Sequence, residues 1–208
     1  MLEDNDRLVI AFSGGKDSML LLNFFLDNPI VNELLVIHID PGFGEKTKAI
    51  RDYLESKGVD FVIHKLNIRD EIPKSSESPC FICSHRRREY LFRIALENNY
   101  KKIAFGHNRD DIVVTFLMNL FFHGEVSTSL PVQEFFGGKI EIIRPLYFLW
   151  EDWITNITTK MGLPLLSGEC PYQGKNKRNE IKELIELYPH TKANLYRALF
   201  NIKKDYLP

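Results

Sequence analysis

Residues 8–18, Leu-Val-Ile-Ala-Phe-Ser-Gly-Gly-Lys-Asp-Ser, decide the fold of this 208-residue chain. The first five are a short apolar run, which is typical of a strand buried on both faces. The two glycines that follow allow a positive φ and a close approach of the backbone to a ligand. A helical pattern then covers residues 17–26, and the free N–H groups at such a helix start attract anions. The stretch predicts a strand, a phosphate-binding loop and a helix.

Strand-like and helix-like patterns continue to alternate up to residue 105. Further strands are predicted at residues 34–39, 60–66 and 103–105, and further helices at 45–57 and around 85–98. This order predicts an α/β fold with parallel strands joined by right-handed crossovers.

Ligands of such folds bind at the carboxyl ends of the strands, near the point where the strand order reverses. Three segments follow predicted strands directly, namely residues 13–18, 40–44 and 106–111. We expect all three to lie at that edge of the sheet.

The pattern changes after residue 105. A helix is predicted at 110–122, then a loop over 124–138 with a hairpin across Gly137-Gly138 into 140–143. Three more helical patterns follow, at 150–161, 179–188 and 193–202. We therefore predict one domain over residues 1–208, with a core at about 7–146 and a helical C-terminal part at about 147–208.

Composition excludes several classes of protein. The chain is 44% hydrophobic and 26% charged, which is the balance of a soluble domain. Its apolar stretch near residues 19–26 is too short for a membrane span, and its acidic N-terminus is unlike a signal peptide. Three cysteines, an odd number, do not suggest a disulfide framework. A cytoplasmic protein without membrane association is expected.

The net charge of −1 at first argues against a nucleic-acid ligand. The charges are nevertheless unevenly spread: residues 80–102 carry six basic and two acidic side chains, and residues 174–208 carry eight and four. Solvated helix faces are the ordinary reading of such blocks. Because polyanion binding depends on local charge, they keep an RNA ligand open.

The cysteines are Cys80 and Cys83, in a Cys-Phe-Ile-Cys motif, and the distant Cys170. This set is compatible with zinc, given His85 or His107 as a fourth ligand, with a redox dithiol, with an iron–sulfur cluster, or with plain buried thiols. Three thiolates on a cubane cluster would leave its fourth iron open.

The hexapeptide Ser13-Gly14-Gly15-Lys16-Asp17-Ser18 after a first strand resembles the signature loop of the N-type ATP pyrophosphatases, or PP-loop enzymes. The resemblance implies a five-stranded parallel sheet with helices on both faces. It also implies that ATP is cleaved between its α- and β-phosphates and that AMP is transferred to an oxygen of the substrate. A divalent cation, Mg²⁺, is expected on the phosphate oxygens.

The motifs further along the chain resemble the iron–sulfur tRNA thiolase branch of that superfamily, and most closely its tRNA 2-thiocytidine synthetase group. The motifs that carry this resemblance are Pro-Cys80-Phe-Ile-Cys83-Ser-His-Arg-Arg-Arg, Ile103-Ala-Phe-Gly-His107-Asn-Arg-Asp-Asp111, Ile143-Arg144-Pro-Leu and the distal Cys170. The resemblance implies a [4Fe-4S] cluster on Cys80, Cys83 and Cys170. It also implies replacement of a pyrimidine C2 oxygen in tRNA by sulfur, from a sulfur donor protein or sulfide, and a homodimer.

Site residues follow from the same resemblance. Those implied for catalysis are Asp111, Arg87 and Lys16. Those implied for ATP binding are Ser13, Gly14, Gly15, Lys16, Asp17, Ser18, His38, Ile39, Asp40, Gly106 and Arg144. For Asp110, Arg144 and His38 a capping or salt-bridge role is an equal alternative.

Other functions stay open at this point. The enzyme could act on another RNA or a small molecule, because the chain lacks the zinc-finger cysteines of the uridine-modifying relatives. A non-catalytic sensor of ATP and the cluster is a further alternative. Metal analysis and an absorption spectrum would separate zinc from iron–sulfur.

Overall fold

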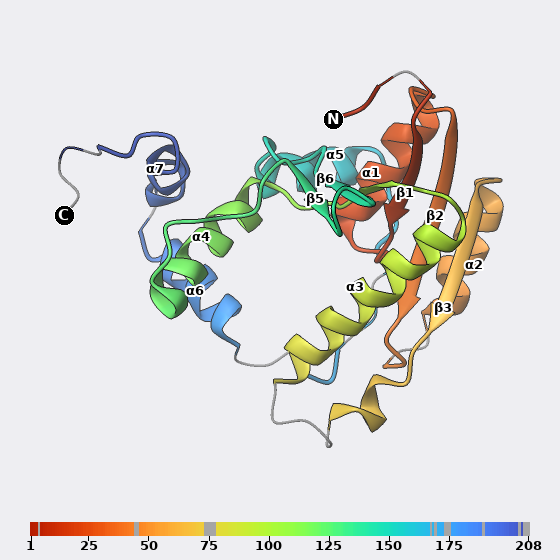
Figure 1. Ribbon diagram of the computed structural model, residues 1–208, viewed down its shortest axis with the longest axis horizontal. Coiled ribbons are helices and arrows are strands. Elements are labelled where there is room, and N and C mark those ends of the chain that lie inside the picture. Colours follow the sequence, from red (N-terminus) through yellow and green to blue (C-terminus); the bar gives the residue numbers. More distant parts are fainter. Residues whose placement is uncertain are drawn as a thin grey trace.

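The structure is a computed structural model that describes residues 1–3, 5–43, 46–72, 78–166, 168, 170–172, 176–188, 190–203 and 205 (Figure 1). Gly44 and Glu45, the end of one predicted loop and the start of one predicted helix, lie outside this set. So do residues 173–175, where the second basic block begins.

Within these residues one sheet has six strands: β1 (Arg7–Ala11), β2 (Glu33–Asp40), β3 (Asp60–Lys65), β4 (Lys102–Ala104), β5 (Val132–Phe135) and β6 (Ile140–Ile143). The helices are α1 (Lys16–Asp27), α2 (Thr47–Ser56), a 3₁₀ turn at Ile68–Asp70, α3 (Pro79–Glu97), α4 (Arg109–His123), α5 (Glu151–Lys160), α6 (Lys177–Glu186) and α7 (Thr191–Ala198). The predicted α/β class is confirmed, and no described helix is long and apolar enough to cross a bilayer.

The strand order is β3-β2-β1-β4-β6-β5. The chain leaves β1 toward β2 and β3 and later returns to β4 on its other side, so the strand order reverses between β1 and β4. Five strands are parallel, as predicted, and β5 adds an antiparallel sixth at the edge by pairing with β6. The predicted hairpin joins these two strands, with Gly137 and Gly138 at φ 65 and 82°.

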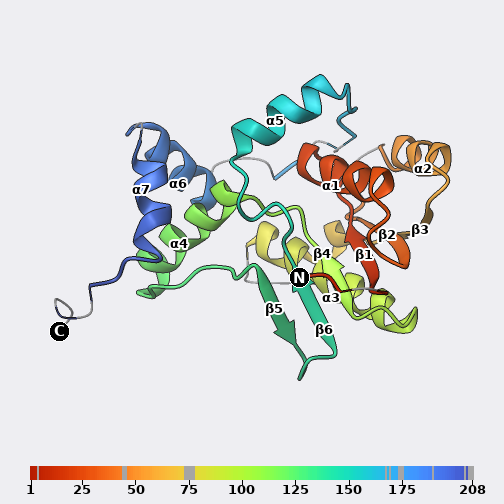
Figure 2. The same cartoon turned by 90° about the horizontal axis from the view of Figure 1, so that it is seen from above.

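Alternate side chains of the strands build two cores, one on each face of the sheet. Leu8 and Ile10 of β1 are fully buried on the face that α1, α2 and α5 cover, and Val9 is fully buried against α3. Figure 2 shows α1, α2 and α5 on one side of the sheet and α3 on the other. Complete burial on both faces explains why β1 reads as a continuous apolar run.

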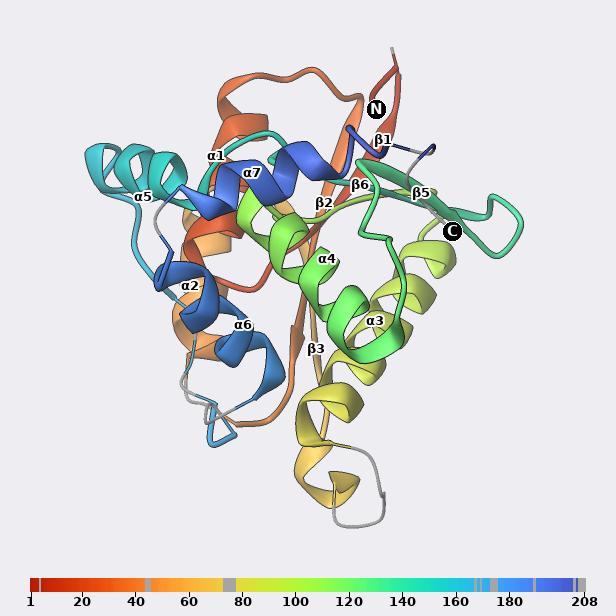
Figure 3. The same cartoon turned by 90° about the vertical axis from the view of Figure 1, so that its left-hand side faces the viewer.

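The last two helices, α6 and α7, pack mainly on α4 rather than on the sheet. Ile181 of α6, only 3% exposed, joins Val114, Phe116 and Leu117 of α4 in a third apolar cluster. Leu195 of α7 packs against the same cluster. In Figure 3 the group of α4, α6 and α7 faces the viewer. This packing holds α6 beside the end of the sheet where α4 begins.

Helix α3 begins earlier than its sequence pattern suggests. We predicted a helix around residues 85–98, whereas α3 starts at Pro79 with Ser78 as its N-cap, whose hydroxyl accepts the Phe81 N–H at 3.3 Å. Proline at the first helical position is favoured because its missing N–H is not needed there. The earlier start places Cys80 and Cys83 in the first turns of the helix.

Candidate active site

The PP-loop connects β1 to α1 at the carboxyl end of the sheet. Gly14 has a φ of 77°, in the region that glycine tolerates best. Ser18 donates its hydroxyl to the Gly15 carbonyl at 2.9 Å and accepts the Ser13 N–H at 3.2 Å. Gly15 caps α1 with no side-chain hydrogen bond to the helix. The loop is thus held from within, and the start of α1 offers backbone N–H groups to an anion.

Gly106, after β4, packs directly on this loop. A Cβ atom at this position would meet the backbone of Asp17 at 3.1 Å and the Ser18 nitrogen at 3.2 Å. Asn108 also reaches the loop, since its amide donates to Asp17 at 2.9 Å. Segments 13–18 and 106–111 therefore lie in contact, as predicted. The close packing at residue 106 requires a glycine, because a side chain there would crowd the loop backbone.

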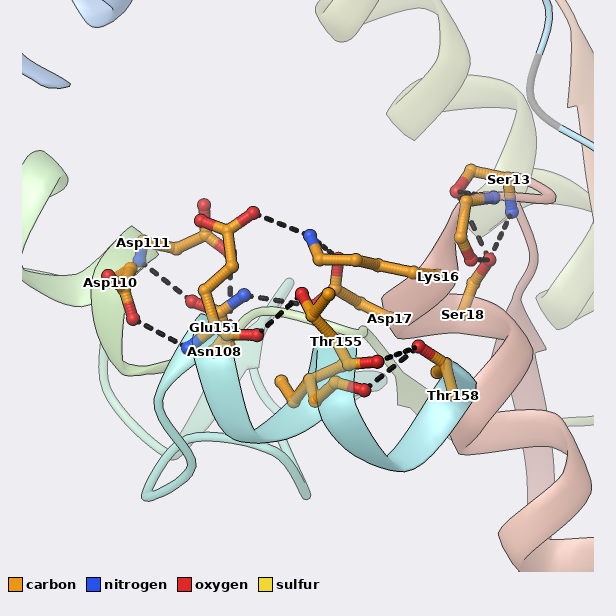
Figure 4. A network of polar contacts seen from close by, with 12 residues as sticks. Ser13, Lys16, Asp17, Ser18, Asn108, Asp110, Asp111, Glu151, Thr155 and Thr158 are labelled. Atoms are coloured by element: carbon orange, nitrogen blue, oxygen red, sulfur yellow. Dashed lines mark hydrogen bonds and ion pairs between the residues drawn. The ribbon is translucent and has the colours of Figure 1, made fainter. Parts of the chain in front are cut away.

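Lys16, the cation of the loop, is held by a carboxylate from the other end of the chain. Its ammonium lies 2.5 Å from Glu151 of α5 and 3.3 Å from Asp17 (Figure 4). Burial alone would lower the pKa of Lys16, but the two carboxylates outweigh burial and raise it. For Glu151, burial acts to raise the pKa, and the ion pair with Lys16 brings it below its usual range. Lys16 therefore stays charged.

Asp111 closes a capping box at the start of α4. Its carboxylate accepts the Asn108 N–H at 3.1 Å, while the Asn108 side chain accepts the Asp111 N–H at 3.2 Å. Its other oxygen pairs with Arg178 of α6. Burial opposes ionisation of Asp111, but Arg178 and His107 keep its pKa below the usual range. The carboxylate is ionised, and both of its oxygens are engaged.

His107 is a neutral, half-buried neighbour of Asp111. Burial lowers its pKa to about 4, with Arg144, Arg178 and Arg88 acting in the same direction and Asp111 opposing them. Arg144 donates its Nε–H to His107 Nδ1 at 3.3 Å, so the ring proton is on Nε2. Arg144 itself lies behind His107 and also bonds to the Leu130 carbonyl. Its predicted contact with ATP stays a prediction.

The end of β2 supplies the second group of predicted nucleotide-binding residues. His38 Nδ1 lies 2.8 Å from the Phe12 carbonyl, and burial lowers the pKa of this histidine. Asp40 accepts the Gly42 N–H at 2.7 Å and the Thr47 hydroxyl at 2.5 Å. His38 therefore donates from Nδ1 and leaves Nε2 free of its proton, whereas Asp40 orders the turn into α2.

Cys83 and Cys170 line the same cavity although they are far apart in sequence. Leu166 donates its N–H to the Gly14 carbonyl at 2.8 Å, which docks the segment before Cys170 on the PP-loop. Burial raises the pKa of the Cys83 thiol; Arg87 opposes this, and the nearby Cys170 and Cys80 thiols add to it. All three cysteines are free.

A single metal ion has no ready ligand set here. Within the described residues, no three His, Cys, Asp or Glu side chains lie close enough to hold one. A multi-iron cluster binds each cysteine through a different iron atom, and Cys80, Cys83 and Cys170 stay a predicted ligand set for one.

Two adjoining cavities occupy this edge of the sheet. One, of about 350 Å³, is lined by the PP-loop, by Ile37 and Ile39 of β2, and by Gly106, His107 and Asp111. The other, of about 200 Å³, is lined by His38, Asp40, Cys83 and Cys170. Ser13 and Arg87 line both cavities. The cavity at the PP-loop and the cavity at Cys83 and Cys170 thus share two wall residues.

Sequence reasoning missed two residues that hold the predicted groups, Glu151 and Arg178. Both lie in the first turn of a C-terminal helix, more than 60 residues from their partners Lys16 and Asp111. Acidic residues are common at helix starts for electrostatic reasons alone, so no local signal marks Glu151. The basic block after Cys170 was a weak signal for Arg178.

Comparisons with known proteins agree with this geometry. The family model described as PP-loop domain matches residues 2–189. A tRNA-cytidine(32) 2-sulfurtransferase of Alkalilimnicola ehrlichii is 33% identical over all of this chain and 70% of its own length, and tRNA-cytidine(32) 2-sulfurtransferase 1 of Francisella tularensis is 34% identical over 97% and 80%. The solved U34-tRNA thiolase NcsA of Methanococcus maripaludis, with its [4Fe-4S] cluster, superposes with a TM-score of 0.75 at 26% identity, over 99% of this chain and 77% of that one.

Proposed function

The chain belongs to the PP-loop family and to its tRNA-cytidine(32) 2-sulfurtransferase group, and on this premise we propose that it is an ATP-dependent sulfurtransferase acting on tRNA. The product proposed is 2-thiocytidine. The observation that carries this proposal is the shared wall of the two cavities, with Ser13 and Arg87 between the nucleotide-binding motifs and the cysteines.

The reaction has two steps. The C2 oxygen of the pyrimidine attacks the α-phosphorus of ATP, the bond to the β-phosphate breaks, and pyrophosphate leaves. A sulfur nucleophile then adds at C2, and AMP leaves with the original oxygen. Adenylation is needed because an unmodified carbonyl oxygen is a poor leaving group, so the enzyme has mainly to position groups and stabilise charge.

The PP-loop supplies the binding of the departing pyrophosphate. The N–H groups at the start of α1 and the hydroxyls of Ser13 and Ser18 provide donors, and Lys16 provides a fixed positive charge. Lys16 must leave Glu151 to reach a phosphate oxygen, and Lys182, 3.6 Å from the other oxygen of Glu151, then remains as its counter-charge. Asp111 is proposed as the oxygen ligand of the Mg²⁺ that accompanies ATP.

Arg87 lies at the boundary between the two cavities that are proposed to serve the two steps. Its guanidinium stays charged at any physiological pH and forks onto phosphate oxygens. Because it lines both cavities, it is placed to bind the phosphate of the adenylated base while sulfur approaches from the cysteine side. Neutral His107 lines the nucleotide cavity without adding a charge.

The cysteines are the proposed ligands of an iron–sulfur cluster. Cys80, Cys83 and Cys170 would hold a [4Fe-4S] cluster, which would supply an iron site for a sulfur species. Arg87 favours the thiolate form of Cys83 that such ligation needs. The sulfur source proposed from the family resemblance is sulfide or a sulfur donor protein, the proposed assembly is a homodimer, and the proposed location is the cytoplasm.

Mass spectrometry of tRNA nucleosides tests the proposal. Deleting the gene from its host should remove 2-thiocytidine from total tRNA, and the wild-type gene should restore it. The gene carrying Asp111→Asn should not restore it, although the protein accumulates to the same level. Unchanged thionucleosides after deletion would overturn the proposed function.

A further inference from the structure

Both carboxylate oxygens of Asp111 already have a partner. One carboxylate oxygen accepts the Asn108 N–H at 3.1 Å, and the other pairs with the guanidinium of Arg178. The Asn108 bond belongs to the capping box that starts α4 and is therefore fixed. A cation that arrives with ATP and binds Asp111 therefore competes with Arg178, because both are positively charged and approach the same carboxylate.

Arg178 is the partner that can move. Its side chain is 41% exposed, whereas that of Asp111 is 22% exposed. It lies in the first turn of α6, a short helix that is anchored by Ile181 and leaves its basic side chains at the surface. A guanidinium released there has donors suited to a phosphate group.

Arg88 is a second arginine close to the place where a phosphate bound by Arg178 would lie. Arg88 of α3 and Arg178 of α6 both lie close enough to His107 to lower its pKa, and Arg88 lines the nucleotide cavity. Arg178 pairs with Asp111, which lines the same cavity as Arg88, so two helices that are distant in sequence bring arginines to the neighbourhood of one cavity. The phosphates of ATP already have the PP-loop and Lys16, which leaves the backbone of the RNA for this pair.

We propose that Arg178 is a phosphate-binding residue for the RNA substrate that is held on Asp111 until ATP and its cation take its place. This inference rests on the proposed function. When RNA phosphate binds Arg178, the Asp111 carboxylate is released for the cation. When the cation binds Asp111, Arg178 is released for RNA. By linkage, ATP and RNA must then raise each other's affinity by the same factor.

Binding of a non-cleavable ATP analogue, α,β-methylene ATP, to the anaerobic full-length holoprotein tests this coupling. With Mg²⁺ present, total tRNA should raise the affinity of the wild-type protein for the analogue about fivefold or more. Arg178→Gln should show a comparable gain without tRNA, and tRNA should add nothing further. The gain should vanish in EDTA, because the competition is for a cation ligand. A merely structural role of Arg178 would not depend on Mg²⁺ in this way.

Lys177→Gln is the matched control. It removes the same charge from the neighbouring residue of α6, but the Lys177 ammonium lies 4.2 Å from the Phe122 ring instead of on a carboxylate. Its affinity for the analogue and its coupling to tRNA should stay at wild-type values. Arg178→Lys keeps the charge but loses the two-pronged guanidinium, so it should retain part of the coupling. This variant also shows whether the behaviour of Arg178→Gln comes from a folding defect.

Two results would overturn the inference alone: tRNA that binds without changing the affinity for the analogue, or a loss of analogue affinity in Arg178→Gln without tRNA. The latter would make Arg178 a ligand of ATP. Failure of the wild-type holoprotein to bind tRNA at all would overturn the proposed function together with the inference.

Discussion

Arg87 lies one helical turn after Cys83 on α3 and opposes the rise in pKa that burial imposes on the Cys83 thiol. The spacing of four residues puts both side chains on the same face of the helix. A thiol that ligates iron has to lose its proton, so Arg87, which lines the proposed nucleotide cavity, would also prepare Cys83 for the proposed cluster.

Arg87→Gln should therefore slow the alkylation of Cys83. Without the guanidinium, the pKa of the thiol rises further and less thiolate is present at neutral pH. Iodoacetamide labelling of the metal-free protein, followed by peptide mass spectrometry across a pH series, measures this for each cysteine. Arg86→Gln is the control, because Arg86 pairs with Glu71 at 2.6 Å and with Glu89 at 2.8 Å. Equal labelling of Cys83 in both variants would contradict the assignment.

Substitution of Lys16 and Glu151 should shift ATP affinity in opposite directions. Lys16→Gln removes a charged donor to phosphate, worth about 1.5–3 kcal/mol, so the affinity for ATP should fall tenfold or more. Glu151→Gln removes the competitor for Lys16, and the affinity should rise a few-fold, since such partly exposed pairs are worth at most about 1 kcal/mol. Calorimetric titration with ATP measures both. The iron–sulfur absorption should be unchanged in either variant, and its loss would mean that the two sites form one structural unit.

The stability of the protein should fall between pH 6.5 and pH 4 because of His107. Its pKa is lowered to about 4 in the folded chain, against about 6.5 in an unfolded one. In this window the unfolded chain binds more protons, so the free energy of unfolding rises with pH. The contribution of His107 is fully present above about pH 6.5, and up to about 3 kcal/mol of it is lost by pH 4. Urea titrations across this range measure it.

His107→Gln should flatten that pH dependence, whereas the exposed His123 on α4 serves as a control. His123→Gln should leave the slope as it is in the wild type. The lowered pKa of buried His38 contributes in the same direction, so some slope remains in His107→Gln. An unchanged slope in this variant would show that His107 is not kept neutral by the fold.

The PP-loop and its neighbours are predictable from sequence because their chemistry depends on local motifs. A buried strand followed by two glycines and a helix leaves few alternatives, and parallel topology then brings Gly106 to the same edge. The ion pairs of Glu151 and Arg178 are not predictable in this way. They depend on how α5 and α6 dock, which is decided by the burial of residues such as Ile154 and Ile181 and not by any motif around the charged residues.

The start of α3 lay between these cases. Ser78 and Pro79 are an ordinary helix start signal, but the mixed residues after them carry no apolar periodicity up to His85. The strand β5 was predicted only as the first arm of a hairpin, without bounds, because a four-residue edge strand has too few alternating positions to stand out. The division of the chain into a core and a C-terminal helical part stays a prediction.

Cys80→Ala should show that cluster binding and ATP binding are independent. The variant should lose the iron–sulfur absorption of the anaerobically purified protein and keep its affinity for ATP, since Cys80 is not among the residues that line either cavity. Iron and sulfide analysis accompanies the spectrum. Loss of ATP binding as well would mean that the fold depends on the metal, and zinc in place of iron in the wild type would contradict the cluster assignment.

Reconstitution of the whole reaction tests the central claim most directly. Anaerobic holoprotein is incubated with unmodified tRNA, ATP, Mg²⁺ and sulfide, and the tRNA nucleosides and adenine nucleotides are measured by mass spectrometry. The account predicts 2-thiocytidine and AMP in equal amounts, with neither formed by Cys80→Ala or in the absence of ATP. Thiolation that proceeds without ATP, or AMP formation by a cluster-loaded and tRNA-bound enzyme with no 2-thiocytidine, would contradict it.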